Sequence, residues 1–494
     1  MLFNSLQYFI FFPIVVTVYF LLPHRFRWLF LLLASCYFYM AFVPIYILIL
    51  AVTIVVDYIA GIYIEQSKGH RRKLFLVLSI ITNVGFLAFF KYYNFVAINI
   101  NHASYLLHWN YSVQLLSILL PIGLSFHTFQ AMSYTIEVYR GHQKAERHFG
   151  IYALYVMFFP QLVAGPIERP QNLLHQFYER HEFDTGKAID GLRLIAWGLF
   201  KKVVIADRLA MIVTIVYHHP QYYPGITLIF STVLFSYQLY SDFSGYTDNA
   251  RGSAQVMGFH LMENFNFPYY SKSIPEFWRR WHISLFSWFR DYLYSPLVYA
   301  GRRFGKRWIY FSLLVTFLIS GLWHGASWTF VLWGALHGCY LVASLLTAKV
   351  RQRFVAFIRL DRLPRLHSAI QIAITFSLWS FSLILFRANS LTDAWFIITH
   401  LFSGVGQFIL HGHSIADLKL LGNLGVDFDK SQIIIGIIAI AFLELLQWLQ
   451  NGKDINTALN EQPWWGRWTL YYIIMLAIVS YGIFGAAQFI YFQF

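Results

Sequence analysis

The feature that most constrains this fold is a long stretch, Trp308 to Ala348, that contains no Lys, Arg, Asp or Glu. About forty residues suffice for two helical passes through a hydrocarbon layer roughly 30 Å thick, because a helix rises about 1.5 Å per residue. His324 lies near the middle of this stretch, in the sequence SGLWHGASW at 320–328. The stretch therefore predicts two membrane-spanning segments with an ionisable imidazole at membrane depth.

Two interpretations of His324 are open. Lipid offers no water to solvate a titratable group, so a histidine at this depth needs a partner, a cavity or a function. In the first interpretation it packs as a structural residue, bonded to a neighbouring carbonyl. In the second, Gly321 and Gly325 allow close approach of a helix or a substrate, because their four-residue spacing clears one helix face. Trp323 and Trp328 are then expected to line the site. We favour the functional interpretation.

Composition indicates a polytopic membrane protein. The chain of 494 residues is 58% hydrophobic, 20% aromatic and only 12% charged. Its net charge of +14 comes from Lys and Arg in short loops beside apolar segments, where basic residues orient helices, so we expect no nucleic-acid partner. Cys36 and Cys339 lie in apolar segments, which indicates neither a disulfide framework nor a cysteine-based metal site. We expect membrane lipid as a partner and no metal.

The order of apolar and polar segments predicts an all-α fold with about eleven transmembrane spans. No soluble stretch is long enough for a second domain, so residues 1–494 are expected to form a single integral-membrane domain. Four regions depart from simple spans. They are a re-entrant segment at 151–170, an interfacial helix joined to a span at 191–217, a span at 226–240 that enters a polar turn at 241–248, and irregular or in-plane helices at 251–306. An external segment is expected to extend to Lys430.

His282 is the second candidate for a catalytic role, in the sequence EFWRRWHIS at 276–284. A catalytic pair needs one neutral imidazole as the base and a second group that orients it or binds the developing oxyanion. Burial lowers the pKa of a histidine and so keeps it neutral. Because His282 lies among charged residues, a structural or interfacial role is the alternative. His127 and His337 have more ordinary apolar neighbours, and we predict that both are hydrogen-bonded core histidines.

The acidic residues within apolar regions are predicted to bond backbone or arginine at broken helices, not to act as acids. They are Asp242, Asp248, Glu168 and Asp291.

Motifs of three enzyme classes are absent. The chain has no glycine-rich phosphate loop with a lysine, no HExxH zinc helix and no GxSxG nucleophile turn. ATP hydrolysis, zinc proteolysis and elbow-type serine hydrolysis therefore lack support. A proton-coupled transporter or lipid flippase, with histidines as relay groups, remains an alternative, as does a catalytically silent membrane scaffold.

Five motifs in order along the chain together resemble the membrane-bound O-acyltransferases, in particular the bacterial branch that contains the membrane component of alginate O-acetylation. The motifs are LPIGLSF at 120–126, FPQLVAGP at 159–166, DFSGY at 242–246, ENF at 263–265 and EFWRRWHIS at 276–284. The resemblance covers a core of about residues 1–390 and thins over the C-terminal spans at 391–494. It implies an MBOAT fold, with re-entrant and interfacial helices around a central tunnel, in a bacterial inner or plasma membrane.

The resemblance also implies a function. His324 matches the family's catalytic histidine and His282 its second active-site histidine. The implied reaction takes an acetyl group from cytoplasmic acetyl-CoA, a donor substrate and not a tightly bound cofactor, to an extracytoplasmic acceptor. A periplasmic or surface protein would pass the acetyl group to a glycan such as alginate or peptidoglycan. Arg279, Arg280 and Arg290 are candidates to attract the phosphates of CoA, although basic interfacial loops also bind lipid headgroups.

Overall fold

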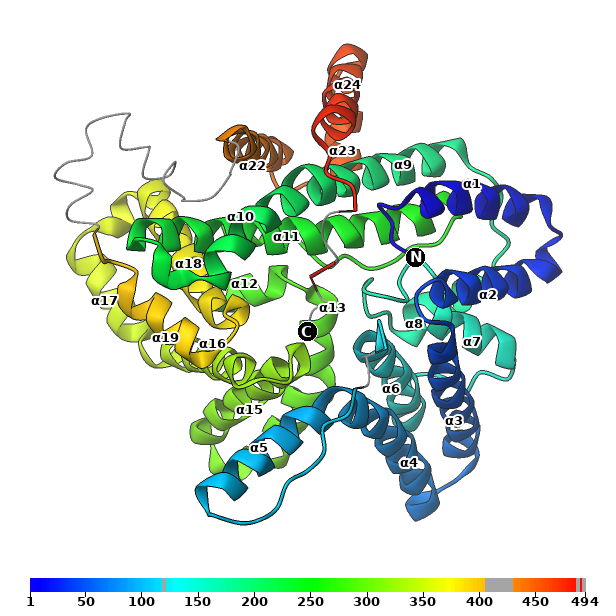
Figure 1. The fold of residues 1–494 in the computed structure, drawn as a ribbon. Helices are drawn as coiled ribbons and strands as arrows, with labels where there is room; N and C mark the ends of the chain where they lie inside the picture. Colours follow the sequence, from blue (N-terminus) through cyan, green and yellow to red (C-terminus); the bar gives the residue numbers. More distant parts are fainter. Residues whose placement is uncertain (118–120, 405–429, 486–488, 491–494) are drawn as a thin grey trace. The chain divides into compact units, whose positions relative to one another are not determined.

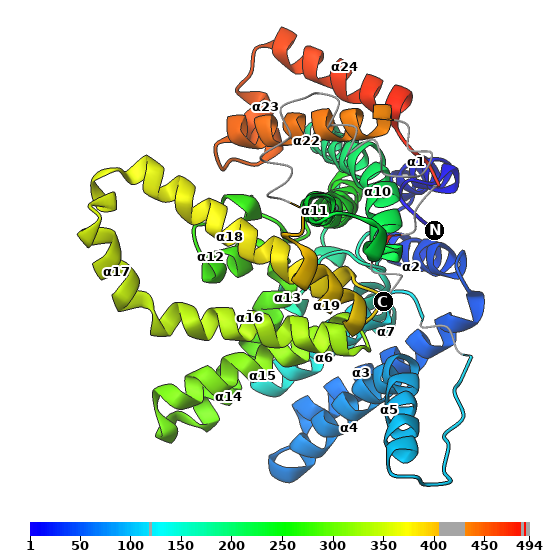
Figure 2. The ribbon, with the colours of Figure 1, turned by 60° about the vertical axis from the view of Figure 1, so that its left-hand side comes forward.

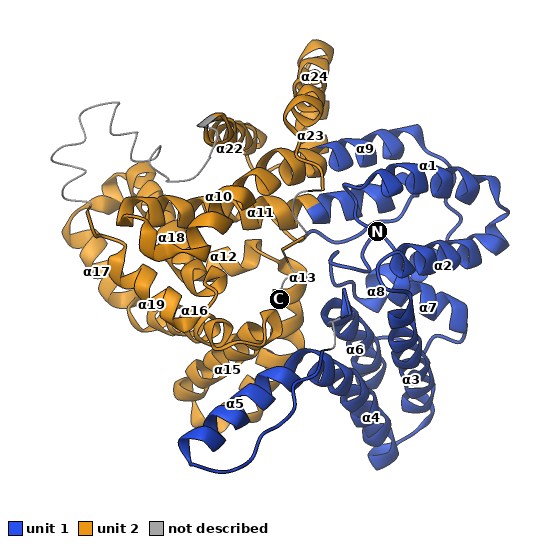
Figure 3. Ribbon diagram, viewed as in Figure 1, with its two compact units in different colours: residues 1–196, 246–263 blue, residues 197–245, 264–494 orange. Residues whose placement is uncertain are grey.

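The computed structural model describes residues 1–117, 121–404, 430–485 and 489–490 (Figure 1). Within these ranges the chain is helical and contains no β-strand, apart from an isolated antiparallel bridge between Phe265 and Trp281. The predicted all-α class is confirmed. The described residues form two compact units (Figure 3): unit 1 comprises 1–196 and 246–263, and unit 2 comprises 197–245 and 264–494.

Unit 1 is built around α3, α4 and α6, which pack against one another. The fully buried carboxylate of Asp57 on α3 joins them, because it accepts hydrogen bonds from Ser79 and Asn83 of α4, and Ser79 Oγ also bonds Thr135 of α6 at 3.0 Å. The helices of this unit are α1 Leu6–Leu21, α2 His24–Met40, α3 Ile47–Gln66, α4 Gly69–Leu87, α5 Tyr93–Leu106, α6 Leu124–Arg140, α7 Phe149–Met157, α8 Pro170–Leu173 and most of α9 Thr185–Leu199.

Unit 2 contains both candidate histidines. Figure 2 shows α15 and α16 side by side, with α18 next to α16, and both pairs of helices are in contact. The helices are α10 Asp207–His218, most of α11 Gly225–Val256, α12 Ile274–Arg280, α13 Ile283–Phe289, α14 Ser295–Ala300, α15 Lys306–His324, α16 Trp328–Leu346, α17 Ala348–Phe357, α18 Pro364–Arg387, α19 Leu391–His400, α22 Lys430–Gln450, α23 Ile455–Asn460 and α24 Trp464–Tyr481.

Among the described residues, five helical segments are long and apolar enough to cross a membrane. They are Pro44–Gln66, Gly69–Leu106, Trp328–Leu346, Pro364–Arg387 and Ser431–Gln450. The membrane class is confirmed, while the count of about eleven crossings, the central tunnel and the single-domain assignment stay predictions. Most of the expected external segment before Lys430 lies outside the described residues.

The predicted turn at 241–248 is wrong. Residues 241–248 lie inside α11, which continues without a break to Val256. The polar side chains of residues 241–248 can be buried in a helix when they have partners. Asp242, for example, bonds both the Lys202 ammonium and the backbone N–H of Ile490. The sequence could not show these partners, which lie far away in the chain.

The other irregular regions are helical in part, and the interfacial helix and span expected at 191–217 stay a prediction. Residues 191–217 form α9, a buried π-helical turn at Phe200–Ala206 and α10 in succession. Residues 251–306 contain the short helices α12, α13 and α14, as expected. The segment 151–170 begins in helix α7, Phe149–Met157, and residues 158–169 then form turns and irregular backbone. Whether this segment enters and leaves on one side of the membrane stays a prediction.

Candidate active site

His324 is the last residue of α15, at the turn that leads into α16. The two helices approach closely because glycines face each other at the crossing. A Cβ atom on Gly321 would lie 2.3 Å from the carbonyl oxygen of Phe330, and one on Gly334 would lie 2.3 Å from that of Phe317. Gly321 therefore leaves one face of α15 open, as expected, and helix α16 packs against that face.

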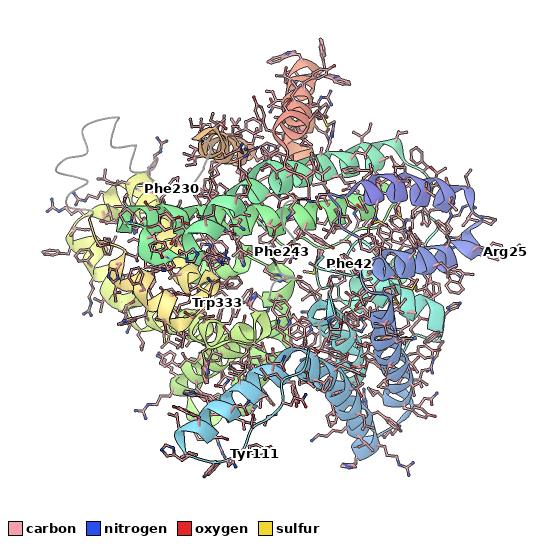
Figure 4. All side chains as sticks on the ribbon, in the orientation of Figure 1. Arg25, Phe42, Tyr111, Phe230, Phe243 and Trp333 are labelled. Atoms are coloured by element: carbon pink, nitrogen blue, oxygen red, sulfur yellow. The ribbon has the colours of Figure 1, made fainter. Side chains whose placement is uncertain are left out.

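Aromatic rings surround the imidazole of His324, which is only 4% exposed. Its ring centroid lies 5.0 Å from those of Trp323 and Trp333 and 5.4 Å from that of Phe386. Trp328, expected to line the site, is 52% exposed, and the buried indole from α16 is that of Trp333 instead. Figure 4 labels Trp333. Phe386 comes from α18, so three helices build this aromatic environment.

His282 lies at the break between α12 and α13. At the start of the first of these helices, the hydroxyl of the N-cap residue Ser273 accepts from the N–H of Glu276, and the Glu276 carboxylate accepts from the N–H of Lys272. After α12 the backbone becomes extended at Trp281 and left-handed at His282, with φ 45° and ψ 54°. The direction of the chain changes within two residues, which turns the His282 side chain into the core.

The imidazole of His282 is fully buried. Its Nδ1 lies 3.3 Å from Oδ1 of Asn264, and its ring contacts Phe243 of α11 edge-to-face at 4.6 Å between centroids. Burial lowers the pKa of His282 well below its usual value, so the neutral form predominates at pH 7.

Trp323 connects the two predicted catalytic residues. Its ring centroid lies 6.1 Å from that of His282 and 5.0 Å from that of His324. The two imidazoles, 42 positions apart in the sequence, therefore share one buried indole as a neighbour within unit 2. A buried imidazole in its neutral form is suited to accept a proton from a hydroxyl group.

The three candidate arginines belong to the same chain segment as His282. Arg279 and Arg280 end α12, and Arg290 begins a π-helical turn after α13. Arg280 pairs with Glu276 at 2.6 Å and Arg290 with Asp291 at 2.8 Å, while Arg279 is exposed.

Both histidines predicted to be core residues form hydrogen bonds in the core. Nε2 of His127 lies 2.5 Å from the hydroxyl of Thr53, and Nε2 of His337 lies 2.9 Å from that of Ser382. Asp242, Glu168 and Asp291 have partners of the kind that was expected. Asp242 bonds Lys202 and a backbone N–H, Glu168 accepts from the N–H of Met262, and Asp291 pairs with Arg290.

Several neighbours of the two histidines carried no assigned role in the sequence. Asn264, Phe243, Trp333 and Phe386 come from four separate segments. Asn264 and Phe243 stand in the motifs ENF and DFSGY, which is the one signal that could have found them. Trp333 and Phe386 look like any aromatic residue in an apolar helix.

Comparisons with known proteins agree on one family. The model described as MBOAT, membrane-bound O-acyltransferase family, matches residues 148–388. The chain is 38% identical over 445 residues to "Probable alginate O-acetylase AlgI" of Pseudomonas aeruginosa, covering 89% of this chain and 80% of that protein. It is 34% identical over 427 residues to "Peptidoglycan O-acetyltransferase" of Helicobacter pylori, covering 80% and 78%. A "Teichoic acid D-alanyltransferase" of Bacillus subtilis is 29% identical over 239 residues, covering 44% and 58%.

The matched residues 148–388 include both histidines and every aromatic side chain described around them. The identities of 38% and 34% extend over about four fifths of the Pseudomonas aeruginosa and Helicobacter pylori proteins. The chain therefore belongs to the membrane-bound O-acyltransferase family and is a multi-pass membrane O-acyltransferase.

Proposed function

We propose that this enzyme moves an acetyl group from cytoplasmic acetyl-CoA to a hydroxyl group on the other side of a bacterial inner membrane. The acceptor would be a cell-envelope or exopolysaccharide glycan, or a periplasmic or surface protein that passes the acetyl group to it. The names of two relatives that match most of the chain support acetyl as the acyl group. The observation that carries the proposal is the pair of buried imidazoles that share Trp323 as a neighbour.

In the proposed reaction His324 is the general base. It takes the proton of the acceptor hydroxyl while the hydroxyl oxygen attacks the carbonyl carbon of the thioester. The new C–O bond forms, the C–S bond breaks, and CoA leaves as a thiolate that takes up the proton. His282 assists by positioning the reactants or by transferring a proton. The aromatic rings around His324 would exclude water and so limit hydrolysis of the thioester.

Arg279, Arg280 and Arg290 are proposed to attract the phosphates of CoA. Their positions at the end of α12 and just after α13 support this role, since His282 immediately precedes α13. The carboxylates beside Arg280 and Arg290 already neutralise part of their charge. Arg279 is therefore expected to contribute most.

The test uses purified protein in lipid nanodiscs with acetyl-CoA and a glycan acceptor, and it measures release of CoA thiol and acetylation of the acceptor. His324→Ala should lower the rate at least about 100-fold, because positioned general bases contribute about 10²–10⁴-fold. His127→Gln, which replaces another buried histidine, is the matched control and should retain activity after correction for folded protein. If His324→Ala keeps wild-type activity, or if the protein moves protons without releasing CoA, the proposal is wrong.

A further inference from the structure

The short segment 264–266 pairs with the break that carries His282. The backbone N–H of Asn266 donates to the carbonyl of Arg280 at 2.9 Å, and the N–H of Ile283 donates to the carbonyl of Asn264 at 3.0 Å. These bonds bracket the left-handed residue on both sides. They fix the backbone at a position where a non-glycine residue with positive φ is strained.

The side chain of Asn264, only 1% exposed, makes two further contacts with the same break. Its Oδ1 accepts the N–H of Ser284 at 3.0 Å and lies 3.3 Å from Nδ1 of His282. The N–H of Ser284 can only donate, so the amide atom facing it must be the oxygen. Because that oxygen can only accept, Nδ1 of His282 must carry a proton and donate it.

We propose that Asn264 is a positioning residue that holds His282 in the Nδ1–H tautomer, so that Nε2 carries the lone pair. During acyl transfer Nε2 then takes from the imidazolium of His324 the proton that came from the acceptor hydroxyl, and passes it to the departing CoA thiolate. This inference rests on the proposed function and sharpens it. A neutral imidazole with its lone pair on Nε2 accepts a proton or a hydrogen bond there and cannot donate to an oxyanion. The role of His282 is thereby proton transfer and not oxyanion binding.

The surroundings of the ring support this assignment. Phe243 lies edge-to-face against it at 4.6 Å, and Trp323 lies 6.1 Å away between centroids. These two neighbours limit rotation of the imidazole, and neither carries a charge. A fixed ring with a fixed tautomer presents the same nitrogen in every turnover, which is the role that a second residue serves when it orients a catalytic histidine.

The experiment compares three variants in the acetyl-transfer assay. Asn264→Leu keeps the size of the side chain but removes the acceptor, and kcat should fall at least about tenfold with little change in KM for acetyl-CoA, as for other residues that orient a histidine. Asn264→Asp keeps the acceptor and adds negative charge beside Nδ1–H, which stabilises the imidazolium. The acid limb of the pH–rate profile should therefore move to higher pH.

Asn266→Leu is the control variant. Asn266 is an exposed neighbour that bonds through its backbone, so this change should leave kcat and the pH–rate profile unchanged.

A purely structural role for Asn264 would change the amount of folded protein but not the pH profile. If Asn264→Leu does not fold, the profile of Asn264→Asp decides, together with ¹⁵N NMR of histidine-labelled wild-type protein with His282→Gln as the reference for assignment. An unshifted profile in Asn264→Asp, an unchanged kcat in Asn264→Leu, or a protonated Nε2 in the wild type would overturn the inference. If His324→Ala is inactive while these results are negative, only this inference fails; if His324→Ala is active, the proposed function fails.

Discussion

His282 must satisfy two demands that oppose each other: its backbone is left-handed, which favours glycine, and its site requires an imidazole. The structure holds the left-handed backbone in place with hydrogen bonds on each side of His282, and it holds the imidazole in place by packing it against Phe243. Strained residues of this kind cluster at functional sites and persist where the surrounding structure holds them in place. The backbone geometry thus agrees with the catalytic role proposed from the side chain.

Arg279 offers a test of donor binding at the scale of one side chain. We expect Arg279→Glu to raise KM for acetyl-CoA several-fold with little effect on kcat, because a reversed charge repels the CoA phosphates in the free enzyme. The effect should shrink at high salt, since exposed charges are screened. Arg353→Glu makes the same charge change on an exposed residue of α17 and is the control. Equal KM values for the two variants would remove Arg279 from the proposed donor site.

Among the elements, the crossing of α15 and α16 holds His324 in position. Gly334→Ala places a methyl group 2.3 Å from the carbonyl oxygen of Phe317, so the helices must separate. We expect a loss of about 1–3 kcal/mol of unfolding free energy and reduced activity, measured by unfolding in detergent and by acetyl transfer. Gly85→Ala on α4 has no atom within 4 Å of the new methyl and should be neutral or slightly stabilising. Similar stability for both variants would show that the crossing tolerates separation.

A second element-scale prediction concerns the buried charges beside α11. Lys202 lies 2.8 Å from both Asp207 and Asp242, so Lys202→Met leaves two carboxylates without their cation. Removing one partner of a buried ion pair costs about 3–5 kcal/mol. Thermal unfolding should show this loss, and the double variant Lys202→Met/Asp207→Asn should recover part of it because one uncompensated charge is gone. No recovery in the double variant would argue that the ammonium stabilises through packing alone.

The sequence predicts local properties well and distant partners poorly. The helices on both sides of His324 were predictable from a stretch without charged residues. The short helices at 251–306 were predictable because polar and apolar residues alternate irregularly there. The helical course of 241–248 could not be predicted, because the cation of Lys202 and the N–H of Ile490 that satisfy Asp242 lie far from it in the chain. Phe386 was missed for the same reason: only the packed helices bring it to His324.

At the scale of the whole molecule, the two described units contain different buried polar groups. Asp57 and its partners on α4 are in unit 1, whereas both candidate catalytic histidines and the three arginines are in unit 2. The chain returns to its own core near its C-terminal end, since Ile483 donates to the carbonyl of Val203 at 2.9 Å and Ile490 donates to Asp242 at 2.8 Å. These two hydrogen bonds therefore join Ile483 and Ile490 to the unit that carries the proposed chemistry, although both residues lie beyond the family match at 148–388.

The last prediction separates an enzyme from a membrane scaffold in living cells. If the protein acetylates an envelope glycan, cells that lack it should lose an acetyl ester from that glycan, and mass analysis of base-sensitive groups will identify the acceptor. Cells that carry His324→Ala should show the same loss, because the reaction needs the base while assembly with partners does not. His127→Gln, produced to the same level, should restore the ester. Full restoration by His324→Ala would instead mean that the protein serves the acetylation machinery without performing the transfer.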